Sequence, residues 1–236
     1  MPVDKSARRV REMFGEIAGR YDLLNHLLSA GIDRWWRRRT VRVVPPQAGS
    51  PVLDVCTGTA DLALAYWRAG GCRVPVVGTD FCRPMLAIAR QKVRRARAGG
   101  WVHLIEADAQ RLPFADNTFG VVSVAFGLRN VQDTEAALGE MARVCRAGGK
   151  VAILEFAMPR PRLLRAVYGW YFRHVLPRVG QALARNRRYA YHYLPASVGE
   201  FPQGESLCRQ LTAAGLEQPA CHWLTWGIAA LYVGTK

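Results

Sequence analysis

The sequence lacks the long apolar runs that membrane-spanning helices require. Its longest apolar stretches, such as residues 121–128, fall far short of the roughly 20 residues that cross a bilayer. The opening residues, MPVDKSARRV, also contain no apolar core of a secretory signal. We therefore expect a cytoplasmic protein that meets a membrane, if at all, peripherally and from the inner face.

Cysteine in metal-binding spacing is also missing. No two cysteines form a C-x-x-C pair, and most lie inside apolar strand or helix patterns as small hydrophobic residues. We expect reduced thiols and no metal site. The cysteines are Cys56, Cys72, Cys82, Cys145, Cys208 and Cys221.

Acidic residues are few. The chain has 33 Lys and Arg against 18 Asp and Glu, a formal net charge of +15. An excess of this size attracts polyanions such as nucleic acid or acidic lipid surfaces. An arginine-rich composition inherited from a GC-rich genome explains it equally well. Residues 157–199 contain no Asp or Glu and are rich in proline, arginine and aromatic residues.

Short β-rich runs alternate with longer helical patterns through the middle of the chain. This alternation is typical of an α/β fold, in which helices cover a parallel sheet. The expected strands are residues 51–55, 74–79, 101–106, 120–125 and 151–156, followed by a short closing pair at 220–224 and 228–233. The expected helices are residues 61–69, 84–97, 133–145 and 204–214, and we assign Gly148 and Gly149 to the C-cap of the third.

With 236 residues, half of them hydrophobic, the chain can bury one large core. We expect a single domain over residues 1–236. Apolar residues at helical spacing predict helices in residues 6–43, and the acid-free residues 157–199 are expected to form a helical insertion. The two segments together are expected to form a cap.

Three successive strands end in an acid, which predicts a nucleotide-like ligand. Asp54 precedes a small-residue turn containing Gly58, where a ligand can approach the backbone closely. Asp80 ends the next strand and can accept hydrogen bonds from ribose hydroxyls. Asp108 follows a third strand and can accept from an adenine amine. Taken singly, a glycine turn after a strand is more often a plain connection, and an acid at a strand end is more often a helix cap. Three such strand ends together favour a bound cofactor.

The turn also indicates which cofactor it binds. Ala60 stands where a dinucleotide-binding turn has its third glycine, which speaks against pyrophosphate bound at the helix N-terminus. S-adenosylmethionine (SAM) carries no phosphate and does not need that contact.

Several separated blocks resemble one family, the ubiquinone/menaquinone C-methyltransferases. The similarity runs over nearly the whole chain, and FGLRNV is its most specific block. The blocks are FGEIAGRYD (14–22) with Asn25, LDVCTGTAD (53–61), ADAQRLPF (107–114), FGLRNV (126–131), EMARVCRAGG (140–149) and LEF (154–156).

This resemblance implies a Rossmann-like class I SAM-dependent methyltransferase fold. Its expected sheet is seven-stranded and mostly parallel, with a C-terminal antiparallel hairpin and a helical cap. It implies SAM contacts at Thr59, Asp80, Asp108 and Ala109. Ala125 replaces a serine that some relatives use as a further contact, so that contact is not carried over.

The resemblance further implies methyl transfer from SAM to a ring carbon of a prenylated quinol. The CTGTAD form and the short N-terminus are more similar to enzymes that convert demethylmenaquinol to menaquinol than to the ubiquinone branch, which acts on a 2-polyprenyl-6-methoxy-1,4-benzoquinol. Because SAM is already activated, most of the rate can come from holding carbon and methyl in near-attack geometry.

Arg129 and Asn130 follow the fourth expected strand, at the edge where the methyl group would lie. We expect them to contact the quinol oxygens, with the arginine stabilising a phenolate. The structural alternative for Arg129 is an ion pair with Asp133 or Asp22. Further candidates for the mouth of the site are Tyr21, Asn25, Tyr189 and His192; the histidine titrates in the range of a base, although it also suits a packed lid.

Basic and aromatic side chains mix in residues 157–199, a pattern typical of peripheral contact with anionic lipid, where a prenyl quinol resides. A solvated basic face explains it nearly as well. We expect no nucleic-acid partner and allow for a homo-oligomer. The first rival function is another small-molecule, RNA or protein methyltransferase, although the Asn/Asp-Pro-Pro-Tyr motif common in such enzymes does not follow the fourth strand. The second is an inactive scaffold that binds lipid or nucleic acid.

Overall fold

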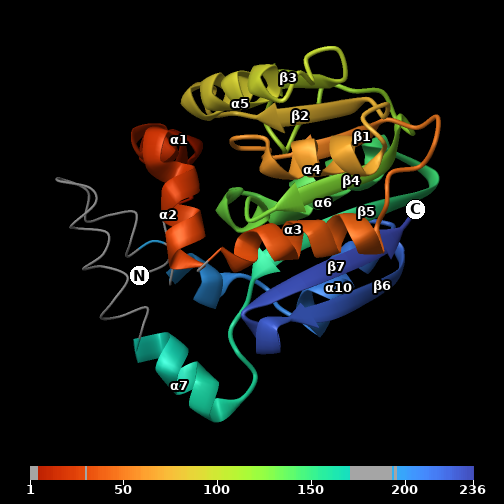
Figure 1. Ribbon diagram of the computed structural model, residues 1–236. Coiled ribbons are helices and arrows are strands. Elements are labelled where there is room, and N and C mark those ends of the chain that lie inside the picture. The colour runs from red at the N-terminus through yellow and green to blue at the C-terminus, as the bar shows by residue number, and fades with distance from the viewer. Residues whose placement is uncertain (1–4, 30, 171–192, 194–195) are drawn as a thin grey trace.

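The computed structural model describes residues 5–29, 31–170, 193 and 196–236 (Figure 1). At its centre lies a seven-stranded sheet in the order β3-β2-β1-β4-β5-β7-β6. Strands β1 to β5 are parallel, and β7 pairs antiparallel with both β5 and β6. The strands are β1 (Val52–Val55), β2 (Val76–Asp80), β3 (Val102–Glu106), β4 (Phe119–Ala125), β5 (Cys145–Phe156), β6 (Glu217–Leu224) and β7 (Ala229–Thr235).

Helices cover both faces of this sheet (Figure 1). One face packs against α3 (Ile32–Val43), α4 (Asp61–Ala69) and α5 (Arg83–Arg95), and the other against α6 (Thr134–Val144) and α10 (Glu205–Ala213). Successive side chains of β1 point to opposite faces of the sheet, so Val52 packs in the hydrophobic core on one face and Leu53 in the core on the other. The expected α/β architecture, with its parallel strands and antiparallel C-terminal pair, is confirmed.

The N-terminal segment is helical, as its apolar spacing predicts. Helices α1 (Ala7–Ile17) and α2 (Tyr21–Leu28) precede α3. Ala18, between them, packs in a small cluster with Cys82 and Met85 at the start of α5. The first two helices therefore lie beside the carboxyl ends of the parallel strands.

The expected insertion at residues 157–199 is only partly described. It includes α7 (Arg162–Trp170), which extends away from the sheet in Figure 1. Residues 171–192, 194 and 195 lie outside the described residues. In the part of the chain that the structure describes, no helix is long and apolar enough to span a membrane.

The expected glycine C-cap after the third helix is wrong. Helix α6 ends at Val144, and Gly148 and Gly149 lie within β5. The Gly148 N–H donates to the Lys236 carbonyl at 2.6 Å, so these residues pair with the end of the chain. A Cβ at Gly149 would lie 3.0 Å from the Gly120 carbonyl. Glycine is therefore required there by strand packing rather than by a helix end.

Candidate functional site

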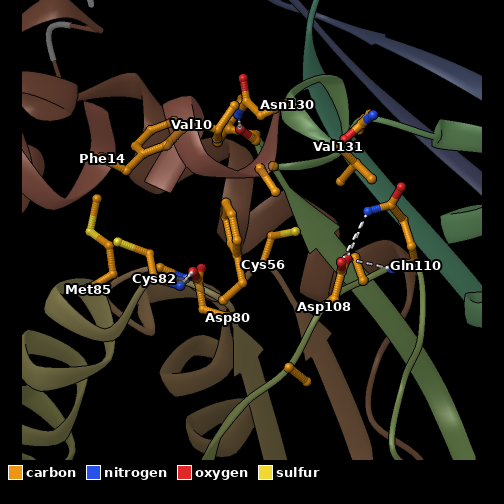
Figure 2. A pocket seen from close by; sticks show the side chains of 18 of the residues that line it. Val10, Phe14, Cys56, Asp80, Cys82, Met85, Asp108, Gln110, Asn130 and Val131 are labelled. Atoms are coloured by element: carbon orange, nitrogen blue, oxygen red, sulfur yellow. Dashed lines mark hydrogen bonds between the residues drawn. The ribbon is translucent and has the colours of Figure 1, made fainter. Parts of the chain in front are cut away.

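A cavity opens at the carboxyl ends of β1, β2 and β4, beneath α1 and α2 (Figure 2). The space inside it, open mouth included, is about 720 Å³. Its position is the one where open α/β sheets bind ligands. The side chains and backbone that line it include Lys5, Val10, Phe14, Tyr21, Cys56, Gly58, Asp80, Met85, Asp108, Ala109, Gln110, Phe126, Asn130 and Gln132.

The turn after β1 forms the floor. Cys56, Gly58 and Ala60 have φ values of 51°, 55° and 68°, which turn the chain sharply under the cavity. Asp54 is buried and accepts a hydrogen bond from Thr57 Oγ1 at 2.7 Å. Burial raises the pKa of Asp54 to about 7. Asp54 thus orients the turn from behind, and it is absent from the residues that line the cavity.

Asp80 lies at the end of β2, where its carboxylate lines the cavity. Its two oxygens accept hydrogen bonds from Gly58 N at 2.9 Å and Cys82 N at 2.8 Å. Each carboxylate oxygen has a second lone pair available for a hydroxyl. Burial raises the pKa of Asp80 to about 6, even though these backbone bonds act in the opposite direction. The acid is therefore placed both to fix the turn and to bind a diol.

Asp108 and Ala109 line the cavity beyond β3. Asp108 is exposed and accepts hydrogen bonds from the backbone and side-chain nitrogens of Gln110, at 2.9 and 3.0 Å (Figure 2). A ligand amine that donates to Asp108 would share this carboxylate with the Gln110 amide or displace it.

Thr59 takes part in a polar cluster behind the turn. Its Oγ1 donates to Asp22 Oδ1 at 2.6 Å. Lys92 Nζ, from α5, donates to Asp22 Oδ2 at 2.9 Å, to Thr59 Oγ1 at 3.1 Å and to Asp61. Thr59 is absent from the residues that line the cavity. The cluster fastens α2 to the turn and to α5, so α2 and the turn are held together.

Arg129 and Asn130 belong to η2 (Leu128–Asn130), a short helix directly after β4. Arg129 is buried, and its Nη1 donates to Glu155 Oε2 at 2.7 Å and to the Phe126 carbonyl at 2.5 Å. The expected alternative partners, Asp133 and Asp22, are therefore wrong, because β5 pairs beside β4 and brings the buried Glu155 close instead.

Asn130, in contrast, lines the cavity. Its Nδ2 donates to the Phe126 carbonyl at 3.3 Å. Its Oδ1 is buried and has no hydrogen-bond partner among the described residues. An unsatisfied buried acceptor costs free energy, which a ligand hydroxyl would recover.

Of the four expected mouth residues, only two are described. Tyr21 lines the cavity, is hydrogen-bonded to Asn25, and has a pKa raised by burial. Asn25 contacts the site through that tyrosine. Tyr189 and His192 lie outside the described residues.

Sequence reasoning missed several residues of the site. Lys5 lines the cavity, and burial lowers its pKa; nothing in the local pattern pointed to it. Cys56 lies in the turn between Asp80 and Asp108 in the view of Figure 2, with a thiol pKa raised by burial. Glu155 could have been recognised from the sequence, because an acid inside the apolar run 151–156 needs a buried partner.

The arrangement matches a known family. The sequence model of the ubiE/COQ5 methyltransferase family matches residues 2–236 of the chain. The chain belongs to this family. It is therefore a SAM-dependent methyltransferase.

Relatives and solved structures agree with this assignment. The chain is 49% identical to a demethylmenaquinone methyltransferase of Thermus thermophilus over 95% of its length and 100% of the relative's. It is 43% identical to a ubiquinone/menaquinone biosynthesis C-methyltransferase of Geobacter sulfurreducens, over 98% and 90% of the two chains. A Methanococcus maripaludis structure, a putative SAM-dependent methyltransferase, shares the fold with a TM-score of 0.66 at 15% identity, covering 94% and 93% of the two chains.

The cavity of this methyltransferase fits SAM. Asp80 can accept from the ribose, Asp108 from the adenine amine, and the backbone around Gly58 can meet the amino acid part. Phe14 and Met85 supply apolar wall. Among the described residues, no group of His, Cys, Asp and Glu could hold a metal ion.

Proposed function

We propose that this methyltransferase methylates a ring carbon of a prenylated quinol, converting demethylmenaquinol to menaquinol. The names of the Thermus and Geobacter relatives support a quinone substrate, and the former supports the menaquinone branch. The benzoquinol of the ubiquinone branch is the alternative substrate.

The observation that carries the proposal is the unpartnered Oδ1 of Asn130 in the cavity wall. We assign it to accept a hydrogen bond from a quinol hydroxyl. The other hydroxyl loses its proton to water, which raises electron density at the ring carbon ortho to it, the carbon to be methylated. After the C–C bond to the methyl group forms, that carbon releases its own proton to water and the ring becomes aromatic again. SAM, when bound, supplies the activated methyl group. Asn130 would then hold the ring so that this carbon faces the methyl.

Arg129 is assigned an electrostatic role from behind the cavity wall. Its guanidinium is held by Glu155 and lies over the Phe156 ring, 5.2 Å from its centroid. Its charge acts toward the cavity, because it lowers the pKa of Tyr21 against the larger effect of burial. The same field would stabilise a phenolate formed beside Asn130.

The remaining site residues divide by position. We assign Asp80, Asp108 and Ala109 to direct SAM contact, together with the backbone at Gly58. Asp54 and Thr59 would act through the turn, since neither lines the cavity. Tyr21, Asn25, Tyr189 and His192 remain candidates for quinol contact.

For location and assembly we keep the expectations of the sequence. We propose a single-domain cytoplasmic enzyme, with residues 6–43 and 157–199 as its cap. It would contact the inner face of an anionic membrane peripherally and bind no nucleic acid.

The test is an assay with methyl-labelled SAM and three separate acceptors: demethylmenaquinol, the benzoquinol precursor and total cellular RNA. We expect label in demethylmenaquinol. Asn130→Leu should reduce kcat by about a hundredfold or more with the affinity for SAM retained, whereas Gln132→Leu, also in the wall, should change kcat little. Label in neither lipid, or label in RNA alone, would contradict the quinol assignment.

A further inference from the structure

The turn between β6 and β7 presents a tryptophan to solvent at a conformational cost. It is η4 (Thr225–Gly227), in which Thr225 and Trp226 have φ values of 47° and 52°. This left-handed region favours glycine, and a bulky residue there is an outlier. The Trp226 side chain is nevertheless 74% exposed. Such a costly, solvent-facing tryptophan points to a role outside the fold of the chain.

This turn lies at the same edge of the sheet as the cavity. Ala229, which follows it, pairs with Phe156 at the carboxyl end of β5. Trp36 Nε1, from α3, donates to Thr225 Oγ1 at 2.7 Å. The turn and the N-terminal half of α3 therefore form one continuous surface at this edge of the sheet, which we call the α3–η4 surface.

The outer face of α3 extends the apolar character of the turn. Trp35 is 49% exposed and Ile32 38% exposed. Leu23 of α2, and Leu163 and Trp170 of α7, are also exposed. Other exposed large apolar residues of the described chain, Trp101 and Ile105, lie at or next to β3, the opposite edge strand of the sheet.

The charge of this surface has one sign. The acid of α3, Asp33, is buried and ion-paired with Arg37. The outward positions of the helix carry arginines beside Trp35 and Ile32. The exposed arginines are Arg34, Arg38, Arg39 and Arg42.

We propose that the α3–η4 surface docks the enzyme onto an anionic lipid bilayer, with Trp226, Trp35 and Ile32 inserted at the interface. Tryptophan beside arginine is favoured at the boundary of headgroups and acyl chains. Aliphatic Ile32 suits acyl chains and cannot stack on nucleic-acid bases. The choice of a membrane rests on the proposed function, because a prenyl quinol is a membrane lipid and the surface lies at the same edge of the sheet as the cavity.

The first test measures binding of the full-length protein to phosphatidylcholine vesicles with and without phosphatidylglycerol, and no quinol present. We expect binding to the anionic vesicles that weakens with salt. Arg38→Gln with Arg39→Gln should weaken it by about thirtyfold, and Trp226→Gly by about tenfold. Glycine suits the φ of this position, so the variant should fold.

Matched controls are Trp101→Gln, and Arg94→Gln with Arg95→Gln on α5, which should change binding less than about twofold because these residues lie away from the surface. Equal losses in the controls, or unchanged vesicle binding in Trp226→Gly, would overturn the proposal. Loss of single-stranded RNA binding with intact vesicle binding would also overturn it, in favour of a nucleic-acid surface.

A second measurement separates this proposal from the proposed function. Trp226→Gly should retain kcat with a short-chain, water-soluble quinol and lose activity with quinol embedded in vesicles. If the wild-type protein methylates no quinol while the variants still lose vesicle binding, the substrate assignment fails and the docking surface stands. If the soluble quinol is methylated and the variants bind vesicles normally, only the docking surface fails.

Discussion

The ion pair between Arg129 and Glu155 offers the sharpest test of how the site is built. The two side chains are only 6% and 1% exposed, so solvent screens their attraction little. Glu155→Gln would leave the guanidinium buried without a counter-charge. Removing one partner of a buried pair costs about 3–5 kcal/mol. The amide oxygen of Gln and the Phe126 carbonyl would still accept from Arg129, so we expect about 3 kcal/mol, the lower end of that range.

The matched double variant, Arg129→Met with Glu155→Leu, removes both charges. The Glu155 carboxylate also accepts from the backbone N–H groups of Arg129 and Phe156, each at 3.2 Å, and these donors would lose their partner. We therefore expect a loss of about 2–3 kcal/mol for the double variant, from unsatisfied donors. The single changes should together cost about 6 kcal/mol or more, so the double variant should lose much less than their sum.

Urea unfolding of the wild type, Arg129→Met, Glu155→Leu and the double variant closes this thermodynamic cycle, with Glu155→Gln measured beside it. A melting temperature lower by about 6–12 °C should accompany Glu155→Gln in a chain of this length. The folded double variant should bind SAM normally but have kcat reduced by about a hundredfold, if Arg129 stabilises the phenolate. Additive losses of stability would refute the ion-pair argument, and an unchanged kcat would leave Arg129 with a structural role alone.

Further predictions concern the turn, the cap and η4. The affinity for SAM should rise as pH increases through about 6, the pKa to which burial raises Asp80, because ribose hydroxyls donate to the ionised carboxylate. Asp80→Asn should flatten that part of the profile in calorimetric titrations, and Asp80→Ala should weaken binding by about 1–3 kcal/mol; an unchanged profile and affinity would place the ribose elsewhere. The same ionisation should lower the free energy of unfolding as pH rises from 3.8 toward about 6, because the pKa of Asp80 in the folded state lies above the ordinary value of an aspartate. Lys92→Met should cost about 1 kcal/mol, since its partners are partly exposed, and should speed proteolysis within residues 18–29; equal cleavage rates would show that the cluster does not hold α2. Trp226→Gly should keep or raise the melting temperature, by up to about 4 °C, because relief of the left-handed strain offsets the added chain entropy; a clear fall would mean that the tryptophan packs within the fold.

The strand ends were predictable from sequence because their signals are local. Apolar runs, small-residue turns and terminal acids placed Asp54, Asp80 and Asp108 at one edge of a parallel sheet, and the structure has them there. The antiparallel closing pair and the N-terminal helices followed from the same short-range patterns. The glycines at 148 and 149 misled, because a helix end and a strand that starts with a bend use the same residue type.

Which of these side chains reaches the cavity was decided by tertiary packing. Asp54 and Asp80 both end strands, yet Asp54 turns under the loop while Asp80 lines the cavity. Arg129 and Asn130 are neighbours in sequence, but the register of β5 beside β4 places Glu155 against the arginine, whereas Asn130 lies in the cavity wall with an unpartnered Oδ1. Lys5 enters the site only because α1 folds back over the sheet.

The sequence by itself thus determined the family, the order of the elements and the edge of the sheet at which the cavity lies. These depend on hydrophobic period and turn chemistry, which act over a few residues. The tertiary structure alone decided the partner of Arg129, the fastening of α2 by Lys92 and the exposure of Trp226. Those depend on contacts between residues that are far apart in the chain, for which a single sequence carries no local signal.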